Sequence, residues 1–142
     1  MEVIPVACAI IFSDKKVLSA QRSVSMTLPG LWEFPGGKIE NGESPEACLI
    51  REIEEELAIS INLVSSLQIN EHSYSEEKVI RLIPFICVWE GDEITLREHQ
   101  DIKWLAKEEL KTLNWAPADV PIVDQLIANW DQIQDRIVGS IK

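Results

Sequence analysis

Basic residues are scarce in this chain of 142 residues. Lysine and arginine together number 13 against 24 aspartates and glutamates, which gives a formal net charge of −11 at pH 7. A surface of this sign repels phosphate backbones and anionic lipids, so we expect neither a nucleic acid polymer nor a membrane as a partner. A small phosphorylated ligand would need metal ions and a few local cations to enter such a field.

Cysteines and long apolar runs are also few. The three cysteines, Cys8, Cys48 and Cys87, are far apart and match no metal-ligand spacing, which favours a reduced cytoplasmic setting over a disulfide framework. The apolar run that opens the chain is interrupted at residues 14–16, well short of a membrane span, and no basic segment precedes it. We therefore expect a cytoplasmic protein, monomer or homodimer, with one domain over residues 1–142.

Strand and helix patterns are both present, which predicts an α/β fold. Runs of apolar and β-branched residues predict strands over residues 3–12, 16–22, 61–71, 78–89 and 103–105. Helical spacing of apolar residues predicts a turn of helix over 107–110 and a helix over 118–137. Pro84 indicates that its strand lies at an edge or contains a bulge, and His72 is expected as a surface residue in a hairpin loop over 72–77.

The segment over residues 36–59 joins a glycine-rich loop, 36–42, to an acidic helix. Ser44 is the expected N-cap, with Pro45 at the first helical position. At about 100° per residue, one helix face carries an acidic group and a second face carries the apolar residues that we expect to be buried. The acidic face holds Cys48, Glu52, Glu55 and Glu56, and the apolar face holds Leu49, Ile50, Ile53 and Leu57.

The three carboxylates of this helix lie within about one turn, where like charges are destabilising. At ~6 Å and an effective dielectric constant of about 20, each pair repels by roughly 3 kcal/mol, and by less than about 1 kcal/mol in full solvent. An ordinary charged helix surface could tolerate the smaller value and is the alternative interpretation. A recessed cluster would require a hard divalent cation such as Mg²⁺ or Mn²⁺, which prefers carboxylate and carbonyl oxygens and bridges to phosphates.

The loop and the helix together resemble the Nudix hydrolase box, G-x5-E-x7-R-E-U-x-E-E-x-G-U with U aliphatic. The matching residues are Gly37, Glu43, Arg51, Glu52, Ile53, Glu55, Glu56 and Ile59. The last glycine of the box is Ala58 here, which affects only the usual helix C-cap geometry. The preceding LWEFPGGKIE is similar to the MutT branch of the family. The resemblance implies an α/β/α sandwich with a mixed β-sheet and hydrolysis of a nucleoside diphosphate linked to another moiety.

The resemblance also implies roles for the acidic residues. Implied ligands of a divalent metal are the Gly36 carbonyl, Glu52, Glu55, Glu56 and, in the loop that precedes Trp104, Glu98, which would serve as a metal ligand or a base. Glu52 is one turn from Glu56 and is placed to orient or deprotonate water. Arg51 can pair with Glu55 or Glu43, so we expect it to orient carboxylates. For Glu98 the alternative is a solvated loop acid.

Four further residues are candidates for substrate binding. Arg22 is a candidate phosphate or base contact, with a surface cation as the alternative, and Lys38 is a candidate phosphate contact. Phe34 is implied to line the nucleoside pocket, although it could be a core aromatic, as we expect Trp32 to be. Asp119 is implied to accept a hydrogen bond from the base; alternatively, it complements the dipole of a helix N-terminus.

Three functions are compatible with these patterns. The MutT-like flanks favour hydrolysis of a nucleoside triphosphate to the monophosphate and pyrophosphate, on oxidised purines such as 8-oxo-dGTP or on CTP-like pyrimidines, in housecleaning of the nucleotide pool. A Nudix enzyme for another substrate, such as ADP-ribose or a dinucleoside polyphosphate, is disfavoured by the short chain. A non-catalytic nucleotide sensor is disfavoured because all three glutamates of the helix are present.

Overall fold

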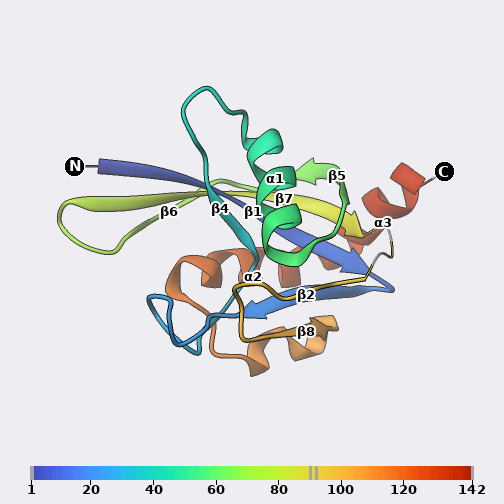
Figure 1. Cartoon of the computed structure of the whole chain (residues 1–142). Coiled ribbons are helices and arrows are strands. Elements are labelled where there is room, and N and C mark those ends of the chain that lie inside the picture. Colours follow the sequence, from blue (N-terminus) through green and yellow to red (C-terminus); the bar gives the residue numbers. More distant parts are fainter. Residues whose placement is uncertain (1, 90, 92, 142) are drawn as a thin grey trace.

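One mixed β-sheet organises the chain (Figure 1). The computed structural model describes residues 2–89, 91 and 93–141. The two longest strands, β1 (Glu2–Ser13) and β7 (Lys78–Trp89), pair in parallel at the centre, and all other pairs are antiparallel. The remaining strands are β2 (Lys16–Gln21), β3 (Trp32–Glu33), β4 (Gly36–Lys38), β5 (Ile61–Ser66), β6 (Asn70–Ser73) and β8 (Asp101–Leu105). The strand order is β3-β2-β1-β7-β5, with β4 beside β1, β6 beside β7 and β8 beside β2.

The side chains of β1 alternate between two hydrophobic clusters because successive residues of a strand point to opposite faces. Ala7, Ala9 and Ile11 pack in the cluster that contains the buried residues of α1 (Pro45–Leu57). Cys8, Ile10 and Phe12 belong to the other cluster, with α2 (Val120–Ala128) and α3 (Trp130–Ile141). Helices therefore cover both faces of the sheet, and the expected α/β/α sandwich is confirmed.

Helix α1 begins as the sequence predicts. The Ser44 side chain accepts a hydrogen bond from the Ala47 N–H at 3.1 Å, and Pro45 occupies the first turn. The helix ends at Ala58, which adopts a left-handed conformation with φ of 58° and donates its N–H to the Glu54 carbonyl at 3.0 Å. The C-cap is thus formed without the glycine of the Nudix box.

The buried face of α1 loses one of the expected residues and gains two others. Ile50 was expected inside but is 50% exposed, whereas Cys48 and Glu56 are buried together with Leu49 and Ile53. Two layers contact this helix, the sheet and the loop that carries β4, so a broader arc of its surface is covered than the apolar residues alone indicate.

Three expected elements are subdivided. The strand over 61–71 is two strands, β5 and β6, so His72 lies in β6 rather than in the hairpin loop. The start of the glycine-rich loop forms β4, which pairs with β1. The helix over 118–137 is replaced by a 3-10 turn, η2 (Pro117–Asp119), followed by α2 and α3, which are separated at Asn129. The turn over 107–110 is confirmed within a 3-10 helix, η1 (Lys107–Thr112).

Pro84 was expected at an edge or a bulge, and the edge position is wrong because β7 has neighbours on both sides. Its carbonyl accepts from the Leu67 N–H, on the side where β5 ends and β6 has not yet begun. The N–H that proline lacks is directed to the same side, at the interruption between two ladders. A central strand can therefore contain this proline.

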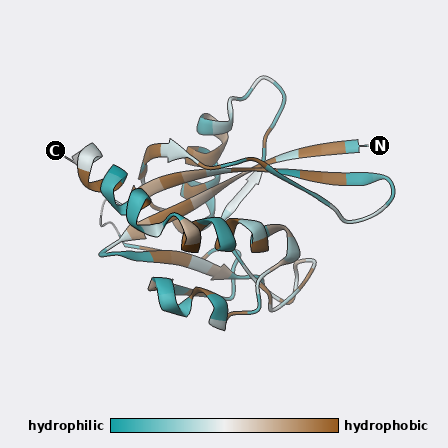
Figure 2. Ribbon diagram, turned by 180° about the vertical axis from the view of Figure 1, so that it is seen from behind, coloured by the Kyte–Doolittle hydropathy of each residue, from teal (hydrophilic) through white to brown (hydrophobic). Residues whose placement is uncertain are grey.

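Helices α2 and α3 cover only part of their face of the sheet (Figure 2). They pack over the half of β1 that contains Ile10 and Phe12, whereas Ile4 and Val6 in the other half line a cavity. Among the described residues, no helix combines the length and the apolar character needed to cross a membrane.

Candidate active site

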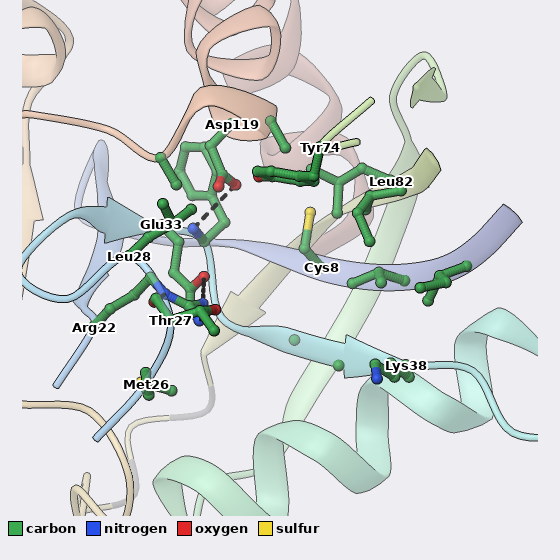
Figure 3. A pocket seen from close by; sticks show the side chains of 18 of the residues that line it. Cys8, Arg22, Met26, Thr27, Leu28, Glu33, Lys38, Tyr74, Leu82 and Asp119 are labelled. Atoms are coloured by element: carbon green, nitrogen blue, oxygen red, sulfur yellow. Dashed lines mark hydrogen bonds and ion pairs between the residues drawn. The ribbon is translucent and has the colours of Figure 1, made fainter. Parts of the chain in front are cut away.

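A cavity of about 550 Å³ lies over the uncovered half of β1 (Figure 3). Its floor is formed by alternate residues of β1 and β7, including Ile4, Val6 and Leu82. Six of the candidate metal-binding and substrate-binding residues line it, namely Arg22, Phe34, Gly36, Lys38, Glu56 and Asp119. Residues from opposite ends of the chain therefore meet around one space large enough for a small molecule.

One end of the cavity contains the buried carboxyl group of Asp119. This residue is 5% exposed and accepts a hydrogen bond from the Phe34 N–H at 3.4 Å. Burial raises the pKa of Asp119 well above its usual range, and the nearby Glu33 carboxylate adds to the increase. Phe34 stacks on Trp115 with ring centroids 4.8 Å apart, so it is a core aromatic that also lines the cavity.

The alternative role of Asp119, a charge at the N-terminus of a helix, agrees with its position but not with its hydrogen bonds. The residue precedes α2 at the N-cap position, but its side chain makes no capping hydrogen bond. Its carboxyl group faces the cavity instead (Figure 3).

Arg22 lies at the rim of the cavity and is held in place by three acceptors. Its Nη1 is 2.6 Å from Glu33 Oε1, its Nη2 is 2.9 Å from Thr27 Oγ1, and its Nε donates to the Thr27 carbonyl. An arginine fixed in this way is not the free surface cation of the alternative interpretation.

Arg51 gathers the carboxylates on the other side of the site. Its guanidinium binds Glu43 through two hydrogen bonds, with Nε–Oε2 at 2.8 Å and Nη2–Oε1 at 2.9 Å. Its Nη1 lies 3.0 Å from Glu52 Oε1 and 3.4 Å from Glu55 Oε2. The hydrogen bonds from Arg51 lower the pKa of Glu43 to about 2. The expected pairing of Arg51 with Glu43 or Glu55 is confirmed for both residues, and Glu52 joins them.

Glu56 differs from its neighbours because Arg51 does not reach it. Its side chain is 5% exposed, and its Oε2 has no hydrogen-bond partner among the residues described. Burial raises the pKa of Glu56 to about 9, with further contributions from the charges of Glu52 and Glu98. Burial also raises the pKa of Glu52, although its hydrogen bond with Arg51 opposes this effect.

Two glycines allow the backbone to approach this cluster. A Cβ on Gly36 would overlap the Ala7 carbonyl oxygen, and a Cβ on Gly37 would overlap the Glu52 carboxylate. Cys48 reinforces the arrangement because its thiol lies 3.3 Å from the Lys38 carbonyl oxygen. The strand β4 and the acidic face of α1 are therefore in direct contact.

The remaining candidates are more exposed. Glu55 has a side chain that is 58% exposed, and Glu98 and Lys38 are exposed as well. Lys38 lines the cavity on β4, on the opposite side of Cys8 from Arg22 (Figure 3). Glu98 is close enough to raise the pKa of both Glu52 and Glu56. The structure thus brings together the candidate site residues of the acidic helix, and Glu98, from a separate loop, lies at the periphery of this group.

The chemistry of this cluster fits a divalent cation. A buried carboxylate with one oxygen left without a hydrogen-bond partner, close to other carboxylates, is stabilised in its ionised form by a positive charge. Within the described part of the chain, no three His, Cys, Asp or Glu side chains already form a metal-binding group. Backbone carbonyl groups or substrate oxygens would therefore have to complete the coordination around Glu56.

Sequence reasoning missed three residues near the cavity. Glu33 binds Arg22 and also lies 2.8 Å from Nε2 of the buried His99. Tyr74, the one tyrosine of the chain, also lines the cavity. The position of Glu33 directly before Phe34 was the available signal, whereas nothing in the local sequence distinguishes His99 or Tyr74.

Comparisons with known proteins agree with this site. The NUDIX domain family matches residues 3–126. A CTP pyrophosphohydrolase of Escherichia coli (strain K12) is 35% identical over 128 residues, which cover 90% of this chain and 94% of that protein. An 8-oxo-dGTP diphosphatase of the same strain is 28% identical over 127 residues, covering 89% and 98%.

The fold has a counterpart among solved structures. The solution NMR structure of the DNA mismatch repair protein MutT from methicillin-resistant Staphylococcus aureus 252, described as a Nudix hydrolase, superposes with a TM-score of 0.74. That protein is 45% identical, and the match covers 90% of this chain and 98% of that one. The family match over most of the chain, together with the Arg51-centred glutamates, establishes that this protein belongs to the NUDIX domain family and is a Nudix hydrolase.

Proposed function

We propose that this protein hydrolyses nucleoside triphosphates to the monophosphate and pyrophosphate in the presence of a divalent cation, Mg²⁺ or Mn²⁺. Nudix hydrolases generally need a divalent metal ion. One observation carries the proposal: a single cavity is lined by Phe34 and Asp119 at its apolar end and by Gly36, Lys38 and Glu56 at its charged end. The first set suits a base and the second suits phosphates with a cation. The relatives named for CTP and 8-oxo-dGTP support this substrate class.

At the charged end, Glu55, Glu56 and the Gly36 carbonyl are the proposed metal ligands, with Glu52 and Glu98 as additional ligands. The cation would supply positive charge to phosphoryl oxygens in the transition state and would acidify water. Glu52 is the proposed base or water-orienting group, because its carboxylate is held by Arg51 and its pKa is raised by burial.

Arg51 and Glu43 are proposed to act by orientation. The two-point contact between them fixes the plane of the guanidinium, which then presents Nη1 to Glu52 and Glu55. A guanidinium fixed in this way limits the rotamers of both glutamates, so less conformational freedom has to be lost when substrate binds.

At the apolar end, Asp119 is the proposed reader of the base edge and Phe34 the proposed stacking surface. Arg22 and Lys38, on either side of the cavity, are the proposed cationic contacts to phosphate or base. In a chain with a net charge of −11, two local cations lower the electrostatic barrier to a polyanionic substrate. A cytoplasmic location follows from these nucleotide substrates and stays part of the proposal.

A nucleotide panel tests the function. Purified protein with Mg²⁺ is incubated with 8-oxo-dGTP, dGTP, CTP, ADP-ribose and a dinucleoside polyphosphate, and released pyrophosphate is measured separately from phosphate. We expect pyrophosphate and a monophosphate from one of the triphosphates. Preferred cleavage of ADP-ribose or the dinucleoside polyphosphate would contradict the proposed substrate class, and tight nucleotide binding without turnover would indicate a sensor.

A further inference from the structure

The residue that precedes Glu98 is attached to the acidic helix. The Arg97 N–H donates to the Glu56 carbonyl at 3.2 Å, and the Arg97 guanidinium lies 3.3 and 3.4 Å from two further carbonyls of the last turn of α1. The Thr95 N–H donates to the Leu57 carbonyl at 2.9 Å. Carbonyls at a helix C-terminus lack partners within the helix, and these contacts supply partners to those of Glu55, Glu56 and Leu57. The segment that enters Glu98 is thereby fixed to the helix that carries the glutamate cluster.

The residue that follows Glu98 is attached to the substrate side of the site. The side chain of His99 is 1% exposed, and its Nε2 lies 2.8 Å from Glu33 Oε2. Because an ionised carboxylate only accepts hydrogen bonds, Nε2 carries the hydrogen and donates it. The Nδ1 atom of His99 has no hydrogen-bond partner within the part of the chain that the structure describes. The bond from Nε2 to Glu33 is therefore the hydrogen bond that orients the imidazole ring.

The two carboxylate oxygens of Glu33 bind two different residues, His99 and, at the rim of the cavity, Arg22. Its Oε2 accepts from His99 and its Oε1 accepts from Arg22 at 2.6 Å. Rotation of this carboxylate would break one of the two bonds. The orientation of the Arg22 guanidinium at the cavity rim is therefore linked to the position of the His99 ring, and so to the backbone of Glu98.

We propose that His99 is a positioning residue: through Glu33 it connects Arg22 to the segment that carries Glu98, and together with Arg97 it holds Glu98 beside the glutamates of α1. The proposal rests on the proposed function, in which Glu98 serves the reaction. Glu98 is exposed, so its own side chain is not fixed by packing. Anchors on both neighbouring residues reduce the conformational entropy lost when Glu98 takes up its working position.

Two substitutions of His99 test the anchor. H99F keeps a ring but removes the donor, and H99Q keeps an N–H donor near the position of Nε2. We expect kcat of H99F to fall about ten-fold with KM changed less than about two-fold, because a misplaced catalytic group affects the transition state more than binding. H99Q should recover most of this loss. H72F is the matched control, because it replaces the other histidine and retains the ring contact with Tyr74.

A second readout needs neither metal nor nucleotide. Amide hydrogen exchange at residues 97–100 should be faster by about ten-fold in H99F than in wild type, and close to wild type in H99Q and H72F. Unchanged exchange in H99F would overturn the anchor, whatever the activity shows.

The third measurement separates positioning from a general structural effect. In an E98Q background, H99F should lower kcat by less than about two-fold, since the group to be positioned is no longer present. Equal losses in both backgrounds would overturn the proposal. If E98Q keeps the kcat of wild type, Glu98 has no part in the reaction; that result overturns both its role in the proposed function and the positioning role of His99, even where exchange confirms the anchor.

Discussion

The Arg51 cluster of the acidic helix and the apolar end of the cavity hold their carboxyl groups in different ways, as Glu43 and Asp119 show. At the acidic helix, Glu43, Glu52 and Glu55 all contact the Arg51 guanidinium, and the pKa of Glu43 falls to about 2. At the other end, the pKa of Asp119 is raised by burial, and the hydrogen bond it accepts comes from a backbone N–H. The first arrangement keeps charge available for cations and phosphates. The second presents a buried carboxyl group that can discriminate between hydrogen-bond patterns.

Glu56 combines features of both ends. It belongs to the acidic helix, yet it is buried and its pKa is raised to about 9, as for a carboxyl group in an apolar pocket. A bound cation would reverse this shift, whereas no such reversal is expected at Asp119. The contrast between the acidic helix and the apolar end therefore depends on a metal ion.

The largest effect is expected for E56Q, which removes the charge and retains the volume. Metal-dependent kcat/KM should fall by a factor on the order of 10² to 10³, the range found when an electrostatic contact to the transition state is removed. Steady-state hydrolysis with varied Mg²⁺ measures this loss, and circular dichroism checks that the fold is retained.

The control is E54Q, which removes an exposed charge from the same helix. It should hydrolyse the substrate within about two-fold of the wild-type rate. Full turnover by E56Q, or by wild type in excess chelator, would show that the metal is not held at Glu56.

The next effect is expected for D119A, and it concerns discrimination. Removing the carboxyl leaves a base donor unpaired, which should cost the preferred triphosphate roughly 2 to 4 kcal/mol in kcat/KM. Poor substrates should change much less. Measuring 8-oxo-dGTP, dGTP and CTP on both proteins gives the ratios directly.

D124A is the control for D119A because Asp124 is an exposed residue of α2 whose carboxylate faces Lys111 at 3.6 Å. It should leave all ratios unchanged. If D119A lowers every substrate by one common factor, Asp119 does not read the base.

The charged end could be predicted from the sequence because its geometry is local. Ser44 begins the helix, the helical repeat brings Arg51 and the glutamates together, and Glu43 lies 8 residues from Arg51. Such short-range relations follow from helix geometry alone. The predicted burial of Ile50 was wrong because burial depends on which layers cover α1, and that is not a local property.

The apolar end and its support depend on contacts between distant residues. Asp119 and Phe34 are 85 residues apart, and His99 and Glu33 are 66 residues apart. Asp119 and Phe34 were identified only through the family resemblance, and Glu33 and His99 were missed. The break between β5 and β6 was likewise hidden, because the strand pattern of the sequence continues across it while the pairing with β7 does not.

A smaller effect is expected in the pH dependence of the metal-free protein. The pKa of Glu56 is about 9 when folded against an ordinary value of 4.5, so the folded state binds this proton more tightly than the unfolded chain. Its contribution to stability is full below about pH 4.5 and is lost as pH rises through about 9. Between pH 6 and 8 the free energy of unfolding should therefore fall by roughly 2 to 3 kcal/mol more in wild type than in E56Q, at 1.36 kcal/mol per pH unit.

Chemical denaturation in chelator at pH 6, 7 and 8 measures this difference. E54Q again serves as the control and should follow wild type. If the free energy of unfolding falls with pH equally in wild type and E56Q, the pKa of Glu56 is not raised in the folded protein, and Glu56 does not differ from Glu43 in the way proposed.

The smallest effect is expected for A58G, and it asks whether the charged end depends on the helix cap. A residue other than glycine in the left-handed conformation costs roughly 1 to 2 kcal/mol, and glycine loses about 0.5 to 1 kcal/mol more entropy on folding. Restoring the glycine of the Nudix box at Ala58, with its φ of 58°, should therefore raise the free energy of unfolding by about 0.5 to 1 kcal/mol. Activity should stay within about two-fold, because Glu52, Glu55 and Glu56 are placed by the register of α1 and by Arg51.

A47G, at an exposed position in the first turn of the same helix, is the control and should lower stability by roughly 0.5 to 1 kcal/mol. Urea denaturation of the three proteins decides the sign: if A58G is destabilised as A47G is, Ala58 is not left-handed in solution, and a large loss of activity would show that the cap positions the glutamates after all.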